Sequence, residues 1–263
     1  MLNYTDCLSQ APNGTDFVPM PENAVKTYFK AAGPNCTKDS AGPTWSQTTV
    51  QQQYGSGTKP VDTQKCSLQF DIPDDLNPPV LFYYRLTNFY QNHRRYVKSL
   101  DTNQLSGSAE SNTTIAGGSC DPLTVAPAPD YRPYYPCGLI ANSLFNDSFS
   151  NPVQLNPHHS SASNITYNMT ESGIAWGSDA SLYGHTNYNY SAIVPPPNWY
   201  LRYQNNYSAE NPPPELDKDE PFQVWMRTAG LPAFSKLAKR NDNETMQCSR
   251  YQVDILNSTT PDS

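Results

Sequence analysis

The clearest strand pattern of the chain lies at residues 80–90, directly after two prolines. Alternate residues of a strand point to opposite faces of the sheet. One face of this segment carries Val80, Phe82, Tyr84 and Leu86, and the other carries Leu81, Tyr83, Arg85, Thr87 and Phe89. Both sets are largely apolar, and β-branched and aromatic residues favour strands. The pattern therefore predicts one long strand over 80–90 that is covered on both faces.

Apolar residues alternate with polar ones in three further segments, at residues 66–72, 222–226 and 251–255. A period of two residues is typical of a strand with one buried face, so each segment is predicted to be a strand. Cys66 is expected on the inner face of the first of them. A short additional strand is expected around Trp45.

Two segments have the three- and four-residue spacing of an amphipathic helix. Residues 21–33 begin with a proline, which suits a first helical turn, and Gly33 can end the helix. The second predicted helix starts at Pro232 and ends in basic residues that suit the negative pole of the helix dipole. Residues 138–145 are apolar but of ambiguous type. Residues 151–211 show no convincing period and predict surface loops held down near 174–176 and 195–199.

These elements predict a mainly β fold, an antiparallel two-sheet sandwich with two short helices and long loops, formed by residues 1–263 as a single domain. The composition agrees, because 25 prolines and 16% charged residues suit strands joined by long polar loops. The formal net charge of −7 argues against a general nucleic-acid binder.

Cysteines and glycosylation sequons indicate the secretory pathway. The chain has six cysteines without metal-type spacing and eleven Asn-x-Ser/Thr sequons, of which chance explains about half. No run approaches 18 apolar residues, and no signal peptide is visible at Met1. Together these features lead us to expect a fragment of a larger protein.

No residue pattern of a known catalytic or metal site occurs, so we expect no enzyme activity, no metal and no cofactor apart from N-linked glycans. The histidines are His93, His158, His159 and His185, and the adjacent pair lies in a polar loop. A glycosidase needs two carboxylates, and the candidates are Asp74, Asp75, Glu215, Asp217, Asp219 and Glu220. Such acidic runs are usually solvated loops. Tyrosines at 188, 190, 200 and 203 with Trp199 suit either sugar stacking or protein contacts.

The densest positive charge follows the strand predicted at 80–90 and comprises His93, Arg94, Arg95 and Lys98. One interpretation is a solvated strand end whose charges pair with nearby acids. The other is a docking patch for an acidic loop or for lipid head groups, because arginine binds carboxylates and phosphates in a bidentate manner. The residues alone do not decide between the two.

Five ordered sequence blocks resemble the β-subunits (accessory subunits) of phospholipid flippases, the type-IV P-type ATPases. The blocks are residues 77–107, 136–147, 173–176, 197–199 and 222–232, and residues 3–7 are similar to the fungal branch. The resemblance implies a glycosylated extracytoplasmic domain between two membrane helices that lie outside this chain. It implies a location on the lumenal or extracellular side of the endoplasmic reticulum, Golgi, endosome or plasma membrane. The family is non-catalytic, and it accompanies the ATPase from the endoplasmic reticulum and supports its transport cycle.

The resemblance also implies two disulfides, Cys7–Cys66 and Cys120–Cys137, which leaves Cys36–Cys248 as the third pair. The sequons expected to carry glycans are led by Asn112 and Asn243. The others are Asn3, Asn13, Asn35, Asn164, Asn168, Asn189, Asn206 and Asn257, whereas Asn146 is less favoured because an aspartate follows it. The residues expected to contact the ATPase are Asn92, His93, Arg94, Arg95 and Trp199. The alternative function is a secreted carbohydrate-binding or carbohydrate-active β-sandwich protein.

Overall fold

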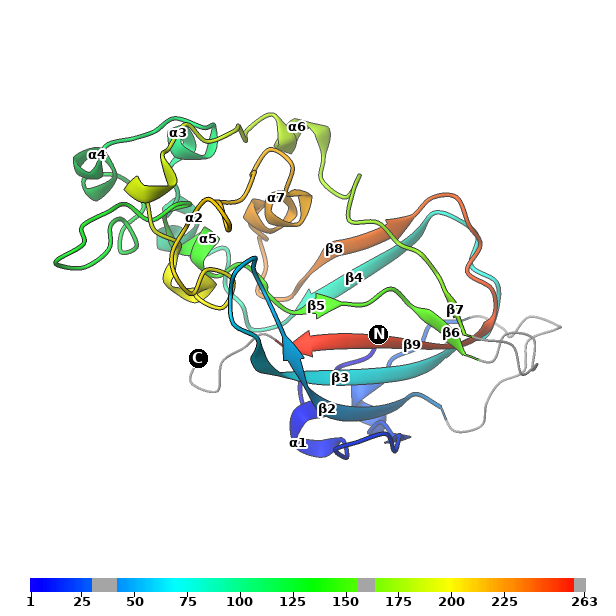
Figure 1. Cartoon of the computed structure of the whole chain (residues 1–263). Helices are drawn as coiled ribbons and strands as arrows, with labels where there is room; N and C mark the ends of the chain where they lie inside the picture. Colours follow the sequence, from blue (N-terminus) through cyan, green and yellow to red (C-terminus); the bar gives the residue numbers. More distant parts are fainter. Residues whose placement is uncertain (30–41, 156–163, 258–263) are drawn as a thin grey trace.

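A computed structural model describes residues 1–29, 42–155 and 164–257 of the chain (Figure 1). In this part, most strands belong to one antiparallel sheet of seven strands, and two more strands pair separately. The strands of the large sheet are β1 (Val18–Pro19), β2 (Thr44–Gln52), β3 (Val61–Ile72), β5 (Ser148–Phe149), β6 (Val153–Leu155), β7 (Ile165–Thr166) and β9 (Ser249–Asn257). The small sheet consists of β4 (Val80–Leu86) and β8 (Phe234–Asn241). The prediction of a mainly β fold with two antiparallel sheets is confirmed.

Within the described residues the helices are all short, and most of them gather beyond one end of the small sheet (Figure 1). The α-helices are α1 (Cys7–Gln10), α2 (Arg94–Lys98), α3 (Thr102–Leu105), α4 (Asn112–Ala116), α5 (Leu139–Asn142), α6 (Gly177–Ala180) and α7 (Glu220–Met226). The 3₁₀ helices are η1 (Glu22–Ala24), η3 (Tyr190–Ala192) and η4 (Pro197–Trp199). Loops and helices together therefore form a region of their own beside the sheets.

The inner face of the large sheet packs against the small sheet. Cys66 and Leu68 of β3 and Val253 and Ile255 of β9 are buried there, and Phe82 of β4 packs onto them. Both strand predictions for 66–72 and 251–255 are confirmed, and so is the strand around Trp45. A separate core fills the helical region, where Trp225, Phe222 and Tyr135 are buried. In the described residues, one part of the buried surface thus lies between the sheets and another part lies under the loops.

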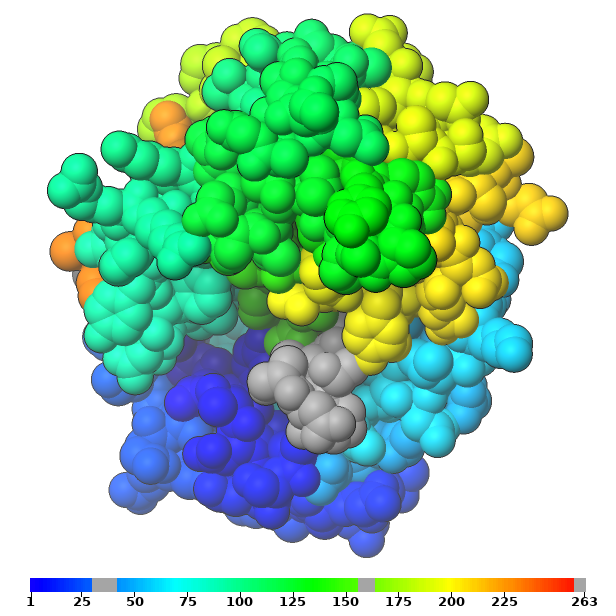
Figure 2. Space-filling model, turned by 90° about the vertical axis from the view of Figure 1, so that its left-hand side faces the viewer, coloured from blue at the N-terminus to red at the C-terminus, as the bar shows by residue number. Residues whose placement is uncertain are grey.

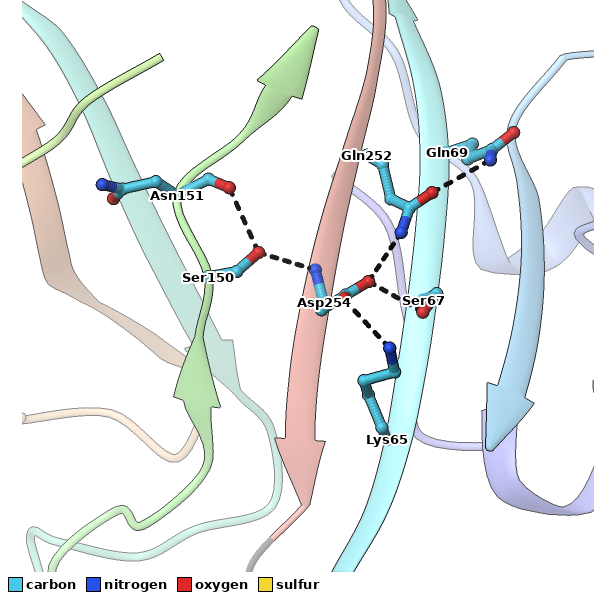
Figure 3. Close-up of polar contacts among 7 residues, drawn as sticks. All are labelled: Lys65, Ser67, Gln69, Ser150, Asn151, Gln252 and Asp254. Atoms are coloured by element: carbon cyan, nitrogen blue, oxygen red, sulfur yellow. Dashed lines mark hydrogen bonds and ion pairs between the residues drawn. The ribbon is translucent and has the colours of Figure 1, made fainter. Parts of the chain in front are cut away.

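The outer face of the large sheet is polar, and its side chains bond across the strands (Figure 3). Asp254 accepts hydrogen bonds from Ser67 (2.7 Å), Gln252 (2.9 Å) and Lys65 (3.1 Å). Ser150 accepts the backbone N–H of Asp254 at 2.9 Å, which joins the β5–β6 connection to β9. Such cross-strand pairs stabilise a sheet and fix its register.

Two of the expected disulfides are present in the structure. Cys7–Cys66 fastens α1 to β3, and Cys120–Cys137 closes a loop of the helical region. Cys36, the partner expected for Cys248, lies outside the described residues.

Two adjacent predictions were wrong, because residues 222–226 belong to α7 and residues 234–238 belong to β8. Asp219 caps α7 by accepting the N–H of Phe222 at 3.0 Å, and Pro221 lies in the first turn. Helix α7 is buried on several sides, so its apolar positions do not follow one period. Residues 234–241 adopt the extended conformation of a strand because β4 pairs with them through backbone hydrogen bonds.

Two further predictions also need correction. The helix expected over 21–33 is replaced, in its described part, by η1 and by backbone hydrogen bonds from Asn3 to Ala24 and from Lys26 to Met1. The strand predicted over 80–90 ends at Leu86, because Asn88 adopts a left-handed conformation (φ 58°) and turns the chain. Its outer face, with Leu81 and Tyr83, is exposed and not covered as predicted.

No helix in the described ranges is both long enough and apolar enough to cross a membrane.

Candidate partner-binding surface

Four of the five predicted contact residues lie together on the surface where β4 leads into α2. Asn92, His93, Arg94 and Arg95 are all exposed, and we call these four residues the basic corner. The prediction of a strand end is wrong here, because His93 is the N-cap residue of α2 and the two arginines begin that helix. In Figure 2, residues around 95 and around 230 lie next to one another at the left edge.

The basic corner is held by a second turn, at residues 229–232, which connects α7 to β8. The backbone N–H of Phe89 donates to the carbonyl of Pro232 at 3.1 Å. The buried Gln91 side chain accepts the N–H of Ala229 at 2.9 Å, and Asn92 donates to the carbonyl of Gly230 at 3.1 Å. Side-chain and backbone bonds therefore fix the position of Asn92 and of the helix that follows.

Aromatic packing anchors the same turn to the buried region. The rings of Phe89 and Trp225 meet edge to face with centroids 5.5 Å apart. The hydroxyl of Tyr96 lies 2.8 Å from that of Ser143, just after α5. The basic corner is consequently presented from a rigid base, as a recognition surface requires.

The charges of the basic corner remain largely available to a partner. Arg95 pairs with Asp121 at 2.8 Å, but both side chains are mostly exposed, and such a pair contributes little stability. Within the described parts of the chain, Arg94 forms no ion pair. The first of the two interpretations was that the charges of this segment pair with nearby acids. Of the two arginines, only Arg95 forms such a pair within the described residues.

Trp199, the fifth predicted contact residue, is a core residue and cannot touch a partner directly. Its side chain is only 6% exposed, and its indole N–H donates to the carbonyl of Ala141 at 2.9 Å. Its ring meets Phe222 edge to face at 6.2 Å. The prediction was wrong because the apolar packing of a Trp-containing loop can be seen only in three dimensions.

The sequon asparagines of the described segments lie at or near the surface. Asn257 is half-buried, and Asn35 is outside the described residues. The remaining sites are exposed: Asn3, Asn13, Asn112, Asn146, Asn164, Asn168, Asn189, Asn206 and Asn243.

The acidic run at 215–220 has structural roles that the sequence did not show. Asp219 caps α7, and Glu215 forms an exposed ion pair with Lys218 at 2.8 Å. The Glu220 carboxylate accepts the backbone N–H groups of Gly173 and Ala175, both at 2.9 Å. Although partial burial raises the pKa of Glu220, these N–H groups lower it overall. The order Asp-Glu-Pro, a cap followed by a first-turn proline, was the signal available in the sequence.

Replacing Glu220 with glutamine is expected to lower the free energy of unfolding by about 1–3 kcal/mol, because a charged acceptor of two backbone N–H groups is lost. Glu220 has a lowered pKa in the folded protein, so its contribution is present above its ordinary pKa of 4.5 and is lost at lower pH. Urea unfolding at pH 7 and at pH 3 measures both effects. Glu215→Gln, which removes an exposed pair, is the control, and an equal loss in both variants would contradict the assigned role.

The other end of α7 is held by a buried lysine. The ammonium of Lys236 donates to the carbonyls of Val224 (2.9 Å), Trp225 (3.4 Å) and Arg227. Burial, and to a smaller extent the nearby Arg227, lower the pKa of Lys236 to about 8, although Asp179 acts in the opposite direction. A cation at the last carbonyls of a helix satisfies groups that would otherwise be unpaired.

A groove of about 1090 Å³ lies between the sheets and the loops. Tyr84 and Phe145 stack on one another in its wall at 4.1 Å. Its carboxylates include Glu215, Asp219 and Glu220, which already bind a lysine, a helix N-terminus and a loop. In the described ranges, no group of three or more metal-type ligands comes together. The groove therefore offers aromatic surface, and these three carboxylates already have structural partners.

Comparison with known proteins decides which family the chain belongs to. The model of the LEM3 (ligand-effect modulator 3) family / CDC50 family matches residues 1–259. The chain belongs to the CDC50/LEM3 family.

Relatives in fungi and animals agree with this assignment. The chain is 45% identical over 254 residues to the phospholipid-transporting ATPase accessory subunit CDC50 of Chaetomium thermophilum, covering 97% of this chain and 61% of that protein. It is 39% identical to the accessory subunit CRF1 of Saccharomyces cerevisiae, covering 97% and 58%. It is 39% identical to human cell cycle control protein 50B, covering 72% and 55%. The chain thus spans about 60% of the length of the fungal relatives.

Family membership confirms the resemblance stated from the five blocks, and the structure shows how CDC50/LEM3 residues of different blocks meet. The guanidinium of Arg227 lies 3.3 Å from the ring centre of Trp176, and Glu220, just before the last block, accepts the N–H groups of Gly173 and Ala175. Gln91 and Asn92 bind the 229–232 turn. The blocks that are separate in sequence therefore form one connected region around α7.

Proposed function

We propose that this chain is the extracytoplasmic domain of a non-catalytic accessory subunit of a phospholipid-transporting type-IV P-type ATPase. In this role it supports the exit of the ATPase from the endoplasmic reticulum, its stability and its lipid-transport cycle. The observation that carries the proposal is family membership over residues 1–259, with relatives whose names describe accessory subunits of phospholipid-transporting ATPases. We further propose that residues 1–263 act as a single domain and that the full-length protein supplies the membrane helices.

The proposed location is the lumenal or extracellular side of secretory-pathway membranes. Two disulfides support it, because structural disulfides persist in oxidising compartments. The exposed sequons support it as well, since the glycosylation machinery acts on surface segments of secretory proteins.

The basic corner is proposed to bind the extracytoplasmic loops of the ATPase. Its arginines are exposed and rigidly based, and arginine forms bidentate bonds with carboxylates. Lipid head groups are the other anionic ligand that such a surface could take.

The test of the function begins with purification of the full-length tagged protein from native membranes and identification of the type-IV ATPase that co-purifies. Both chains are then co-expressed, and complex formation and lipid-stimulated ATP hydrolysis are measured. Formation of the complex, together with hydrolysis that depends on the subunit, is the expected result. Absence of a stoichiometric ATPase, or binding of glycans in its place, would reject the proposal.

Replacing Arg94 and Arg95 together with alanine is expected to weaken the complex, because truncation of a charged partner in a desolvated pair typically costs about 2–5 kcal/mol. Complex formation is measured by co-purification and folding by the melting temperature. Arg202→Ala, at an exposed arginine of a different segment, is the control. Unchanged assembly of the double variant would show that the basic corner is not the contact, while loss of folding would favour a purely structural role.

A further inference from the structure

Three large apolar side chains are strongly exposed next to the basic corner. Tyr90 is 59% exposed, Trp176 is 63% exposed and Leu231 is 69% exposed. Single exposed apolar residues are common, but neighbouring ones often mark an interaction site. We call these three residues the apolar ridge.

Contacts between their segments place the three residues in one region. Arg227 stacks on Trp176 at 3.3 Å and lies four positions before Leu231. The turn that carries Leu231 is bonded to the turn that carries Tyr90, through Ala229–Gln91, Gly230–Asn92 and Pro232–Phe89. The apolar ridge therefore extends from the start of α6, past the end of α7, to the basic corner. Asn92 of the basic corner lies at the border between the two surfaces.

The segments under the apolar ridge are held rigidly. Arg227, which stacks on Trp176, is also paired with Asp179 of α6 at 3.5 Å. Lys236 fixes the last carbonyls of α7 directly below the turn. A surface that is ordered before binding loses little entropy on association, and tryptophan, tyrosine and arginine are the residues most enriched in binding hot spots.

Charge selects the chemistry of the partner. Arg227 lies over the ring of Trp176, and Arg94 follows the turn that carries Tyr90, in a chain whose formal net charge is −7. Asp179 already pairs with Arg227, whereas Arg94 forms no ion pair within the described residues. Positive charge of this kind beside apolar side chains favours a segment with apolar residues flanked by acidic ones.

We propose that the apolar ridge is a second contact for the ATPase and that it receives an extracytoplasmic loop carrying an apolar residue next to acidic residues. This inference rests on the proposed function. The loop lies across Trp176 and Leu231 and places its carboxylates toward Arg227 and the basic corner. The two surfaces then form one continuous interface with an apolar centre and a charged border.

The test replaces Trp176 and Leu231 together with alanine in the full-length subunit, co-expressed with the ATPase identified by co-purification. We expect at least a tenfold weaker complex while the subunit keeps its melting temperature. The control replaces Tyr131 and Ile165, which are 58% and 52% exposed on other segments, and is expected to assemble normally. Leu231→Glu serves as a second variant in case the first does not fold, because Leu231 lies in an exposed turn.

The outcomes separate the inference from the function on which it rests. If Trp176→Ala/Leu231→Ala and Leu231→Glu both assemble normally with an ATPase that requires the wild-type subunit, the apolar ridge is not a contact and the function stands. If the wild-type subunit pairs with no ATPase, the function itself fails. Loss of binding to vesicles of phosphatidylcholine and phosphatidylserine, with assembly unchanged, would assign the ridge to the membrane and overturn the proposal.

Discussion

Replacing Gly138 with alanine is expected to lower the free energy of unfolding by about 4 kcal/mol or more. Gly138 precedes α5 with φ 97° and ψ 171°, a conformation that is essentially restricted to glycine and that costs about 1–3 kcal/mol with a side chain. An added Cβ would also lie 2.1 Å from the backbone oxygen of Ser99. Ser99 directly follows α2, so relief of this overlap would displace the basic corner. Both stability and assembly with the ATPase should therefore suffer.

Alanine variants of two other glycines separate the two causes of the lost stability at Gly138, the backbone conformation and the steric overlap with Ser99. Gly14 has φ 122° but open space around its Cβ position, whereas Gly177 has neither a left-handed φ nor a close neighbour. Urea unfolding of the three alanine variants should rank the losses as Gly138, then Gly14, then Gly177. A loss at Gly138 no larger than that at Gly14 would contradict the close approach to Ser99.

Alkaline pH is expected to unfold the protein between about pH 10 and pH 12. Burial, together with the nearby Tyr188 and Asp217 and against a hydrogen bond with Thr186, raises the pKa of Tyr135 to about 12. Burial also raises the pKa of Tyr207 and, to about 12, that of Tyr251. The unfolded chain releases these protons near pH 10, so the stability present below pH 10 is lost as pH rises toward 12. Two pH units correspond to about 3 kcal/mol for Tyr135 alone.

Tyrosinate absorbance and circular dichroism, recorded on the same samples, measure this transition. We expect one group of tyrosines to ionise without structural change and a second group to ionise only as the near-ultraviolet dichroism disappears. Tyr135→Phe should raise the pH of unfolding, and Tyr131→Phe, at an exposed position, should not. Ionisation of all tyrosines in one phase before unfolding would contradict the prediction.

The basic corner could be found from the sequence, because four charged or polar residues in a row after an apolar segment form a local signal. The apolar ridge could not be found in the same way. Tyr90, Trp176 and Leu231 lie in three distant segments, and large apolar residues are normally assumed to be buried. Their exposure depends on which neighbours cover them. Trp199 was predicted to be a contact residue but is buried. The reason is again its neighbours, because α5 and Phe222 cover its side chain.

The sequence by itself determined the mainly β fold, the strands at 66–72 and 251–255, and the family. Alternation over seven residues in the first case is long enough to exclude a helix, and the outward residues pair directly across β3 and β9. The tertiary structure alone decided that 222–226 is a helix and that 234–238 is a strand. The alternation at 222–226 covers only five residues, and the helical spacing after Pro232 rests on a few apolar positions, so the outcome depends on the core around α7 and on the pairing of β8 with β4. The tertiary structure also decided the roles of Glu220 and Lys236, because each binds backbone groups of segments that only folding brings close to it.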